Sequence, residues 1–165
     1  MTVRQLALAL LGAAAIATAA PGCGDAEDSS AEPASIETSS ISKQRFIQEA
    51  EAICARANRW LLKNLSEYAA DKKAKGSGRA QAELLSDAMK AVGLPRVEAT
   101  IRDIQSLGAP AGDEAQLEAF LTQLQQETDA LQAQPQLSMK AVFVEGFAAS
   151  GQLARDYGLD ACAYS

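Results

Sequence analysis

Apolar residues recur at helical spacing through nearly the whole chain from Ile41 onward. In the first stretch they advance in steps of three and four residues, which places one buried stripe along a long helix. Ser42 is the predicted N-cap of this helix, and the glycines of segment 76–78 are predicted to end it. The stripe contains Ile47, Ala50, Cys54, Ala57, Leu61 and Tyr68, and it is widened by Phe46, Ile53 and Trp60.

A second helical stretch is interrupted by a proline. Pro95 inside a regular helix would cost about 3 kcal/mol, because proline lacks a backbone N–H and clashes with the preceding turn. We therefore expect one kinked helix or two short ones. The apolar positions are Leu84, Leu85, Ala88, Met89 and Val92 before the proline, and Val97, Ile101, Ile104 and Leu107 after it.

Two more helices are predicted in the C-terminal half. Asp113 and Gln116 have the spacing of a capping box at the start of the third helix. Pro135 or Ser138 is predicted to open the fourth, and Gly158 to end it. The predicted buried positions are Leu117, Phe120, Leu121, Leu124 and Leu131 in the third helix, and Val142, Val144, Phe147, Ala148 and Gly151 in the fourth.

Nothing in the pattern is typical of a β-strand, since alternating β-branched runs and hairpin turns are absent. The sequence therefore predicts an all-α fold, an antiparallel bundle of about four helices with one helix kinked or split.

The first 22 residues have the pattern of a cleaved export signal. A basic start precedes an apolar run from Leu6 to Ala20, which is shorter than the roughly 20 residues that span a bilayer. The segment Ala20-Pro21-Gly22-Cys23 resembles a bacterial lipobox, which predicts that Cys23 is lipidated and becomes the mature N-terminus. An alternative cleavage site at Ala17-Thr18-Ala19 would release a secreted protein instead.

Residues 23–40 are predicted to be a disordered acidic and serine-rich tether, with Ile36 as the one large apolar residue after Cys23. Residues 41–165 then form a single bundle domain. A chain that starts at Cys23 has lost Arg4 and no acidic residue, so its net charge is −7. That charge argues against a nucleic-acid partner, which would require a concentrated basic face.

Cysteine parity predicts a disulfide. Lipidation of Cys23 leaves Cys54 and Cys162, and exported proteins tend to oxidise such pairs. An antiparallel bundle can bring the first helix and the end of the last helix together. We expect this disulfide to have a structural role, because no C-x-x-C spacing marks it as redox-active.

Three segments resemble small, alanine-rich, exported or lipid-anchored helical proteins of actinobacteria. The resemblance is carried by Ile41-Ser42-Lys43 through Asn58, by the segment 109–114, and by the segment 154–162, which ends in Ala161-Cys162. It supports the extracytoplasmic compartment and the disulfide. It implies no activity, substrate or binding residue.

An enzyme is not expected. The chain has no histidine, which excludes Ser-His and Cys-His nucleophile systems and the E-x-x-H di-iron motif. We predict no catalytic residue, no metal and no cofactor, and we interpret the helical carboxylates as a solvated face. These carboxylates are Glu49, Glu51, Asp87, Glu98, Asp103, Glu118, Glu127 and Asp129.

Two features indicate binding. Aromatic residues on the first and last helices, Trp60, Tyr68, Phe143 and Phe147, are predicted to line an apolar pocket, with ordinary core packing as the alternative. A basic cluster at Lys72, Lys73, Lys75 and Arg79 is either a contact for anionic lipid or a solvated loop. The predicted function is an envelope-anchored binding module for a small apolar ligand or an envelope protein. The alternative is a structural or stress-related envelope lipoprotein without a ligand.

Overall fold

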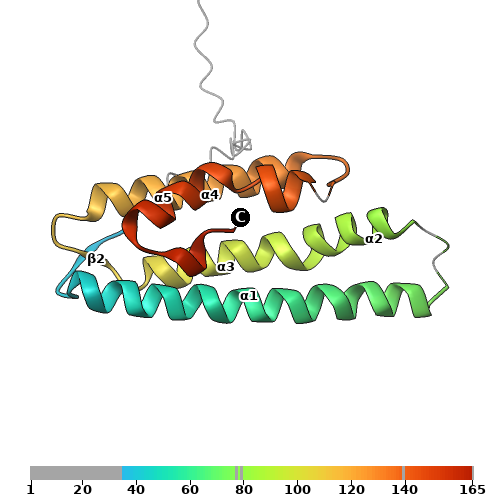
Figure 1. The fold of residues 1–165 in the computed structure, drawn as a ribbon, viewed down its shortest axis with the longest axis horizontal. Helices are drawn as coiled ribbons and strands as arrows, with labels where there is room; N and C mark the ends of the chain where they lie inside the picture. The colour runs from blue at the N-terminus through green and yellow to red at the C-terminus, as the bar shows by residue number, and fades with distance from the viewer. Residues whose placement is uncertain (1–34, 77, 79, 139, 165) are drawn as a thin grey trace, which may run out of the picture. The chain divides into compact units, whose positions relative to one another are not determined.

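The fold is an antiparallel bundle of four helical stretches, as the sequence predicts. The computed structural model describes residues 35–76, 78, 80–138 and 140–164, apart from the side chains of Ala74 and Phe143. The predicted leader, Cys23 and residues 24–34 of the predicted tether lie outside this part of the chain. Figure 1 shows that α1 (Lys43–Ala74) runs along one side and that each following stretch reverses direction.

The first helix, α1, is buried along only part of its length. Ser42 caps it as predicted, since its hydroxyl accepts a hydrogen bond of 3.3 Å from the Arg45 amide. None of the described side chains from Asn58 to Lys75 is buried. The buried positions lie in the first half and are Phe46, Ala50, Ile53, Cys54 and Ala57.

The second stretch accommodates its proline with a π-helical segment. The helix α2 (Gln81–Ala88) continues through η1 (Met89–Gly93) into α3 (Leu94–Gln105), and Pro95 lies in the first turn of α3. The wider turn of a π-helix relieves the clash that a proline causes in a regular α-helix. The predicted kinked or split helix is therefore confirmed.

The fourth stretch is more broken than the sequence predicts. After α4 (Glu114–Ala133), a π-helical segment η2 (Ala141–Glu145) precedes α5 (Ala148–Tyr157) and the short 3₁₀ turn η3 (Asp160–Cys162). The Ser138 hydroxyl accepts a hydrogen bond of 3.0 Å from the Ala141 amide, so Ser138 opens this stretch.

The break shifts the helical phase of the fourth stretch. Val142, Phe147 and Gly151 are buried as predicted, but Val144 is 63% exposed and Ala148 also faces solvent. Assigning these two residues to the core was wrong, because a π-helical turn carries more residues than an α-helical turn and the helix is interrupted at Phe147.

A short extended segment enters the bundle before α1. Strand β1 (Thr38–Ser39) pairs in parallel with β2 (Ala109–Pro110), and the Ala109 amide donates a 2.7 Å hydrogen bond to the Glu37 carbonyl. Ile36 is buried against the core. The prediction that disorder extends to Ser40 was therefore wrong for residues 36–39, as was the expectation of no strand, because burial of Ile36 holds the segment against the bundle.

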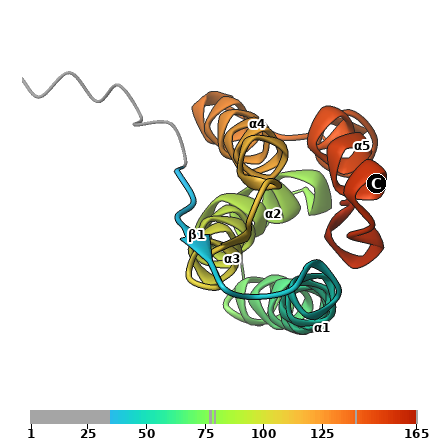
Figure 2. The same ribbon diagram turned by 90° about the vertical axis from the view of Figure 1, so that its left-hand side faces the viewer.

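The disulfide joins the two ends of the bundle domain. Cys54 on α1 and Cys162 in η3 are bonded, with Cα atoms 5.1 Å apart and a sequence separation of 108. Figure 2 views the bundle end-on and shows η3 and the C-terminal residues on the side where α5 faces α1. The predicted pairing is confirmed, and it holds the C-terminal residues against α1.

Candidate functional site

A pocket of about 260 Å³ lies beside the second half of α1, in which no described side chain is fully buried. Both π-helical segments contribute to it, Met89 from η1 and Val142 from η2. Interruptions of this kind recur at functional sites in helical proteins. Eight of the ten lining residues are apolar, and the full set is Asn58, Leu61, Leu62, Leu65, Met89, Val97, Val142, Phe147, Ala163 and Tyr164.

One face of α1 forms the outer wall of the pocket. Asn58, Leu61, Leu62 and Leu65 are three, four and seven residues apart, so their side chains share one face of the helix. Leu61 and Leu65 are half-buried, whereas Leu62 is 72% exposed. The leucines thus connect the interior of the pocket with solvent along α1.

The C-terminal wall of the pocket is fixed by a clamp on α1. The Glu51 carboxylate accepts a hydrogen bond of 2.8 Å from the Ala161 amide, and the Asn58 side-chain amide donates one of 2.8 Å to the Ala161 carbonyl. Between them on the helix, Cys54 is bonded to Cys162. These three attachments position Ala163 and Tyr164, the next two residues, at the edge of the pocket.

Tyr164 brings a polar group into apolar surroundings. Its ring packs on that of Phe147, with centroids 5.4 Å apart. Its hydroxyl is buried and has no hydrogen-bond partner within 3.5 Å in the described structure. Burial raises the pKa of Tyr164, an effect that the neighbouring Thr100 hydroxyl and Arg96 guanidinium partly offset. The Thr100 hydroxyl itself donates to the Arg96 carbonyl, at 2.9 Å.

Only one of the predicted pocket aromatics is placed in this pocket. Phe147 lines it and is 3% exposed. Trp60 is 42% exposed and lies instead beside a shallow hollow on α3, with the Arg96 guanidinium 5.8 Å from its ring centroid. Tyr68 is half-buried, and the Lys72 ammonium lies 5.2 Å from its ring centroid. The side chain of Phe143 lies outside the described structure.

Trp60 lies outside this pocket for a geometric reason, and it lines the separate hollow against η1 and α3. Each residue along a helix turns the side chain by about 100°, so Trp60, two residues after Asn58, points to the side of α1 opposite the face that lines the pocket. Sequence reasoning missed Asn58, Ala163 and Tyr164. The available signal was the cluster of three leucines in the less buried half of α1, which a helix facing only solvent would not carry.

Two of the carboxylates considered for chemistry accept hydrogen bonds from backbone amides of another element. Glu51 holds Ala161, and Glu127 on α4 accepts hydrogen bonds from the amides of Ala149 and Ser150 at 3.0 and 3.3 Å. Within residues 35–164, no group of three or more Asp, Glu or Cys side chains is arranged to hold a metal ion.

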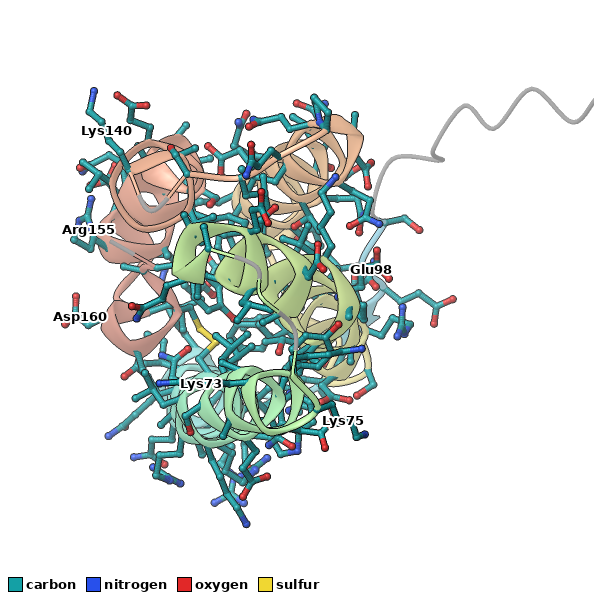
Figure 3. The ribbon with its side chains drawn as sticks, turned by 90° about the vertical axis from the view of Figure 1, so that its right-hand side faces the viewer. Lys73, Lys75, Glu98, Lys140, Arg155 and Asp160 are labelled. Atoms are coloured by element: carbon teal, nitrogen blue, oxygen red, sulfur yellow. A yellow bond between two sulfur atoms is a disulfide. The ribbon has the colours of Figure 1, made fainter. Side chains whose placement is uncertain are left out.

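The basic cluster lies at the far end of α1 from residue 35. Lys75 pairs with Asp71 at 2.8 Å, and Lys72 lies against the ring of Tyr68. Figure 3 shows Lys73 and Lys75 on the outside of the bundle, at the end of α1 nearest the viewer, with the disulfide further inside. Arg79 lies outside the described residues. Lys75 is thus paired with an acidic residue of its own helix, whereas Lys72 contacts a neutral ring and keeps its full charge.

No helix in the described part of the chain combines the length and apolar character that a bilayer crossing requires. Comparison with known proteins identifies no relative: no protein-family model, no curated protein and no solved structure matches this chain.

Proposed function

We propose that this protein is an extracytoplasmic helical binding module that takes a small apolar ligand into the pocket between α1, η2 and the C-terminal residues. The observation that carries the proposal is the pocket itself, 260 Å³ with eight apolar residues among the ten that line it. No residue is assigned a catalytic role, and the proposed activity is binding alone.

The size of the pocket supports a small ligand. An engineered apolar cavity of about 150 Å³ in another protein stays dry and binds benzene. By the same ratio of volume to atoms, this pocket accommodates roughly ten non-hydrogen atoms. A substituted benzene or a short acyl segment fits that limit, whereas a complete two-chain lipid does not.

The contrast with the rest of the bundle also supports binding. The first half of α1 is tightly covered, with Phe46, Ala50, Cys54 and Ala57 fully buried. A bundle with only a structural role would be expected to fill its interior throughout, because close packing contributes to stability. Here the leucines of the second half line one wall of an open pocket, which is available to a ligand.

A titration with p-xylene tests the proposal. We expect saturable binding by ligand-observed NMR, and loss of binding in Ala163→Leu, which places three additional carbon atoms on the pocket wall. Ala119→Leu is the matched control, because it adds the same atoms on the exposed face of α4. Trp60→Phe should also leave binding unchanged, since Trp60 lies outside the pocket.

Two results would contradict the proposal. If p-xylene does not bind, or binds Ala163→Leu and the parent protein equally while both keep their helical circular dichroism, the pocket is not a ligand site. The structural alternative would then be preferred. Native mass spectrometry of protein from its own host would identify any natural occupant.

We further propose that Cys23 carries a lipid and anchors the module to the outer face of the cell membrane. The support is the leader, followed by Gly22-Cys23 and a polar stretch. Mass spectrometry of the N-terminal peptide should detect a diacylated cysteine. An unmodified chain that begins at Ala20 would instead indicate a secreted protein.

A further inference from the structure

Positive charge is concentrated on α1. Residues 43–74 contain seven basic and four acidic residues, a net charge of +3. The whole chain has a net charge of −6, so the residues outside α1 together carry −9. Figure 3 shows side chains of α1 that end in nitrogen atoms on the side facing away from the other helices. The fold therefore has one basic side on an otherwise acidic chain.

Four of these basic residues form a stripe along the outer side of α1. Arg59 is fourteen residues from both Arg45 and Lys73, which is close to four helical turns, so the three share one face. Lys63 follows Arg59 by one turn. All four side chains are exposed. We call Arg45, Arg59, Lys63 and Lys73 the basic stripe.

The basic stripe is only partly neutralised by acidic neighbours. Arg45 is paired with Glu49, and the Lys63 ammonium lies 3.9 Å from the Glu67 carboxylate. Ion pairs between exposed side chains are weak, so these two cations remain available to another anion. Among residues 35–164, as far as they are described, no carboxylate forms an ion pair with Arg59 or Lys73 within 4.0 Å.

An exposed leucine lies beside the basic stripe. Leu62 is 72% exposed and follows Arg59 by three residues, so the two side chains are neighbours on the helix surface. Lys73 is eleven residues further on, about three turns along the same face. The headgroup region of a bilayer accepts basic and apolar side chains together, whereas a soluble polyanion offers no apolar contact to Leu62. The combination favours a membrane surface as the partner.

We infer that the outer side of α1 docks on the anionic headgroups of a phospholipid membrane, with the basic stripe among the phosphates and Leu62 at the boundary with the acyl chains. The inference goes beyond the proposed binding function. The proposed anchor at Cys23 would bring α1 to such a surface. Ser35 is twelve residues after Cys23, a length that spans at most about 40 Å, and from there the chain passes through β1 into α1.

Co-sedimentation with vesicles tests the inference. The chain 23–165 with Cys23→Ser lacks the leader and cannot be lipidated, and it retains every core residue from Ile36 to Cys162 together with the disulfide. One set of vesicles is phosphatidylcholine alone, and the other contains one third phosphatidylglycerol. We expect binding to the anionic vesicles only. Sodium chloride at about 0.5 M should release the protein, because salt screens exposed charges.

Matched charge removals locate the contact. Arg59→Gln with Lys63→Gln should weaken vesicle affinity about 25-fold, at roughly fivefold for each basic residue near an anionic membrane surface. Arg102→Gln with Lys140→Gln is the control, because it removes the same charge from exposed positions outside α1. Figure 3 shows Lys140 on the side of the bundle away from α1. The control should bind nearly as the parent protein does, and both variants should keep its circular dichroism.

Three results would overturn the inference. The first is no binding to the anionic vesicles at low salt. The second is equal binding to both kinds of vesicle, or binding that survives high salt, since neither involves headgroup charge. The third is equal affinity of the two double variants, which would show that α1 is not the contact. The p-xylene titration uses no vesicles, so either proposal can fail while the other stands.

Discussion

The hydroxyl of Tyr157 on α5 donates a hydrogen bond of 2.7 Å to the carboxylate of Asp113, the residue before α4. The Lys43 ammonium of α1 lies 3.3 Å from the same carboxylate and 4.3 Å from the centre of the Tyr157 ring. The ring of Phe46 on α1 packs edge-on against that of Tyr157, with the ring centroids 5.9 Å apart. The Tyr157 side chain on α5 is thus in contact with residues of α1 and with the residue that precedes α4.

The first prediction concerns this pair. We expect Tyr157→Phe to lower the free energy of unfolding by about 1 kcal/mol at neutral pH, the lower part of the range for a hydrogen bond to a charged group, because Asp113 keeps contact with solvent. Urea unfolding followed by circular dichroism measures the difference between the variant and the parent protein.

The difference in unfolding free energy between the parent protein and Tyr157→Phe should shrink both at acidic and at strongly basic pH. The Tyr157 hydroxyl is the main cause of the lowered pKa of Asp113, so the stabilisation is present above the pKa of an unfolded Asp, 3.8, and is lost as the pH falls below it. Burial is the main cause of the raised pKa of Tyr157, and the hydrogen bond to Asp113 is the second cause. The stabilisation is therefore also lost as the pH rises above about 10, where an unfolded tyrosine ionises.

Tyr164→Phe is the control, because its hydroxyl lacks a partner and its removal should not destabilise. Equal losses for the two variants would contradict the prediction.

The second prediction concerns the disulfide. Closing a loop of 108 residues stabilises the fold by about 4 to 5 kcal/mol in the chain-entropy estimate, and removal of a native disulfide typically costs about 2 to 5 kcal/mol. We expect a loss in that range in the double variant Cys54→Ala with Cys162→Ala. A reductant should lower the stability of the parent protein and leave the double variant unchanged. A parent protein that is indifferent to reductant would refute this assignment of stability.

The third prediction concerns Glu127 as a cap supplied from a neighbouring helix. Its carboxylate accepts from the amides of Ala149 and Ser150, which are unpaired donors at the start of α5. Glu127→Ala should therefore cost about 1 kcal/mol of unfolding free energy. Glu127→Gln should retain part of this, because its amide oxygen still accepts a hydrogen bond. Glu118→Ala, on the exposed face of the same helix, should change stability little, and a similar loss there would count against capping.

The fourth prediction concerns Gly146 between η2 and α5. A Cβ atom at this position would lie 2.3 Å from the Ala141 carbonyl oxygen and 2.9 Å from a Leu131 methyl group. Since backbone must move to make room, we expect Gly146→Ala to destabilise by about 1 to 3 kcal/mol, measured by thermal unfolding. Gly78→Ala adds the same atom in open space and should have almost no effect. Equal behaviour of the two variants would show that the close approach does not matter.

Local rules predicted much of the fold because helical phase depends on neighbouring residues. The buried positions of the first half of α1 follow from spacing alone, and Gly158 ends α5 in the left-handed conformation with φ 95°, as predicted. The predicted capping box places the start of α4 correctly at Asp113, but the hydrogen bond that such a box requires is absent. The Asp113 side chain makes no cap hydrogen bond and instead accepts from Tyr157, a partner 44 residues away that no local pattern indicates.

The pocket could not be predicted in the same way. It lies where Asn58 of α1 bonds to Ala161 of η3, and its walls include Met89 and Val142 from the two π-helical segments. These features depend on contacts between elements that are far apart in sequence, and local spacing does not predict such contacts. Tyr164 follows the last cysteine and lies outside any periodic stretch. The residues next to it in sequence therefore give no indication that it lines the pocket.

The uneven burial of α1 has a consequence for its motion. Backbone amides exchange with solvent through openings whose free energy reflects how many buried contacts must break. From Lys43 to Ala57 an opening would have to expose the core and strain against the disulfide, whereas beyond Asn58 none of the described side chains is buried. Deuterium should therefore enter the last turns of α1 well before the first. Since Leu61, Leu62 and Leu65 lie on the labile half, the same fraying that admits deuterium would give the ligand of the proposed binding function a route into and out of the pocket.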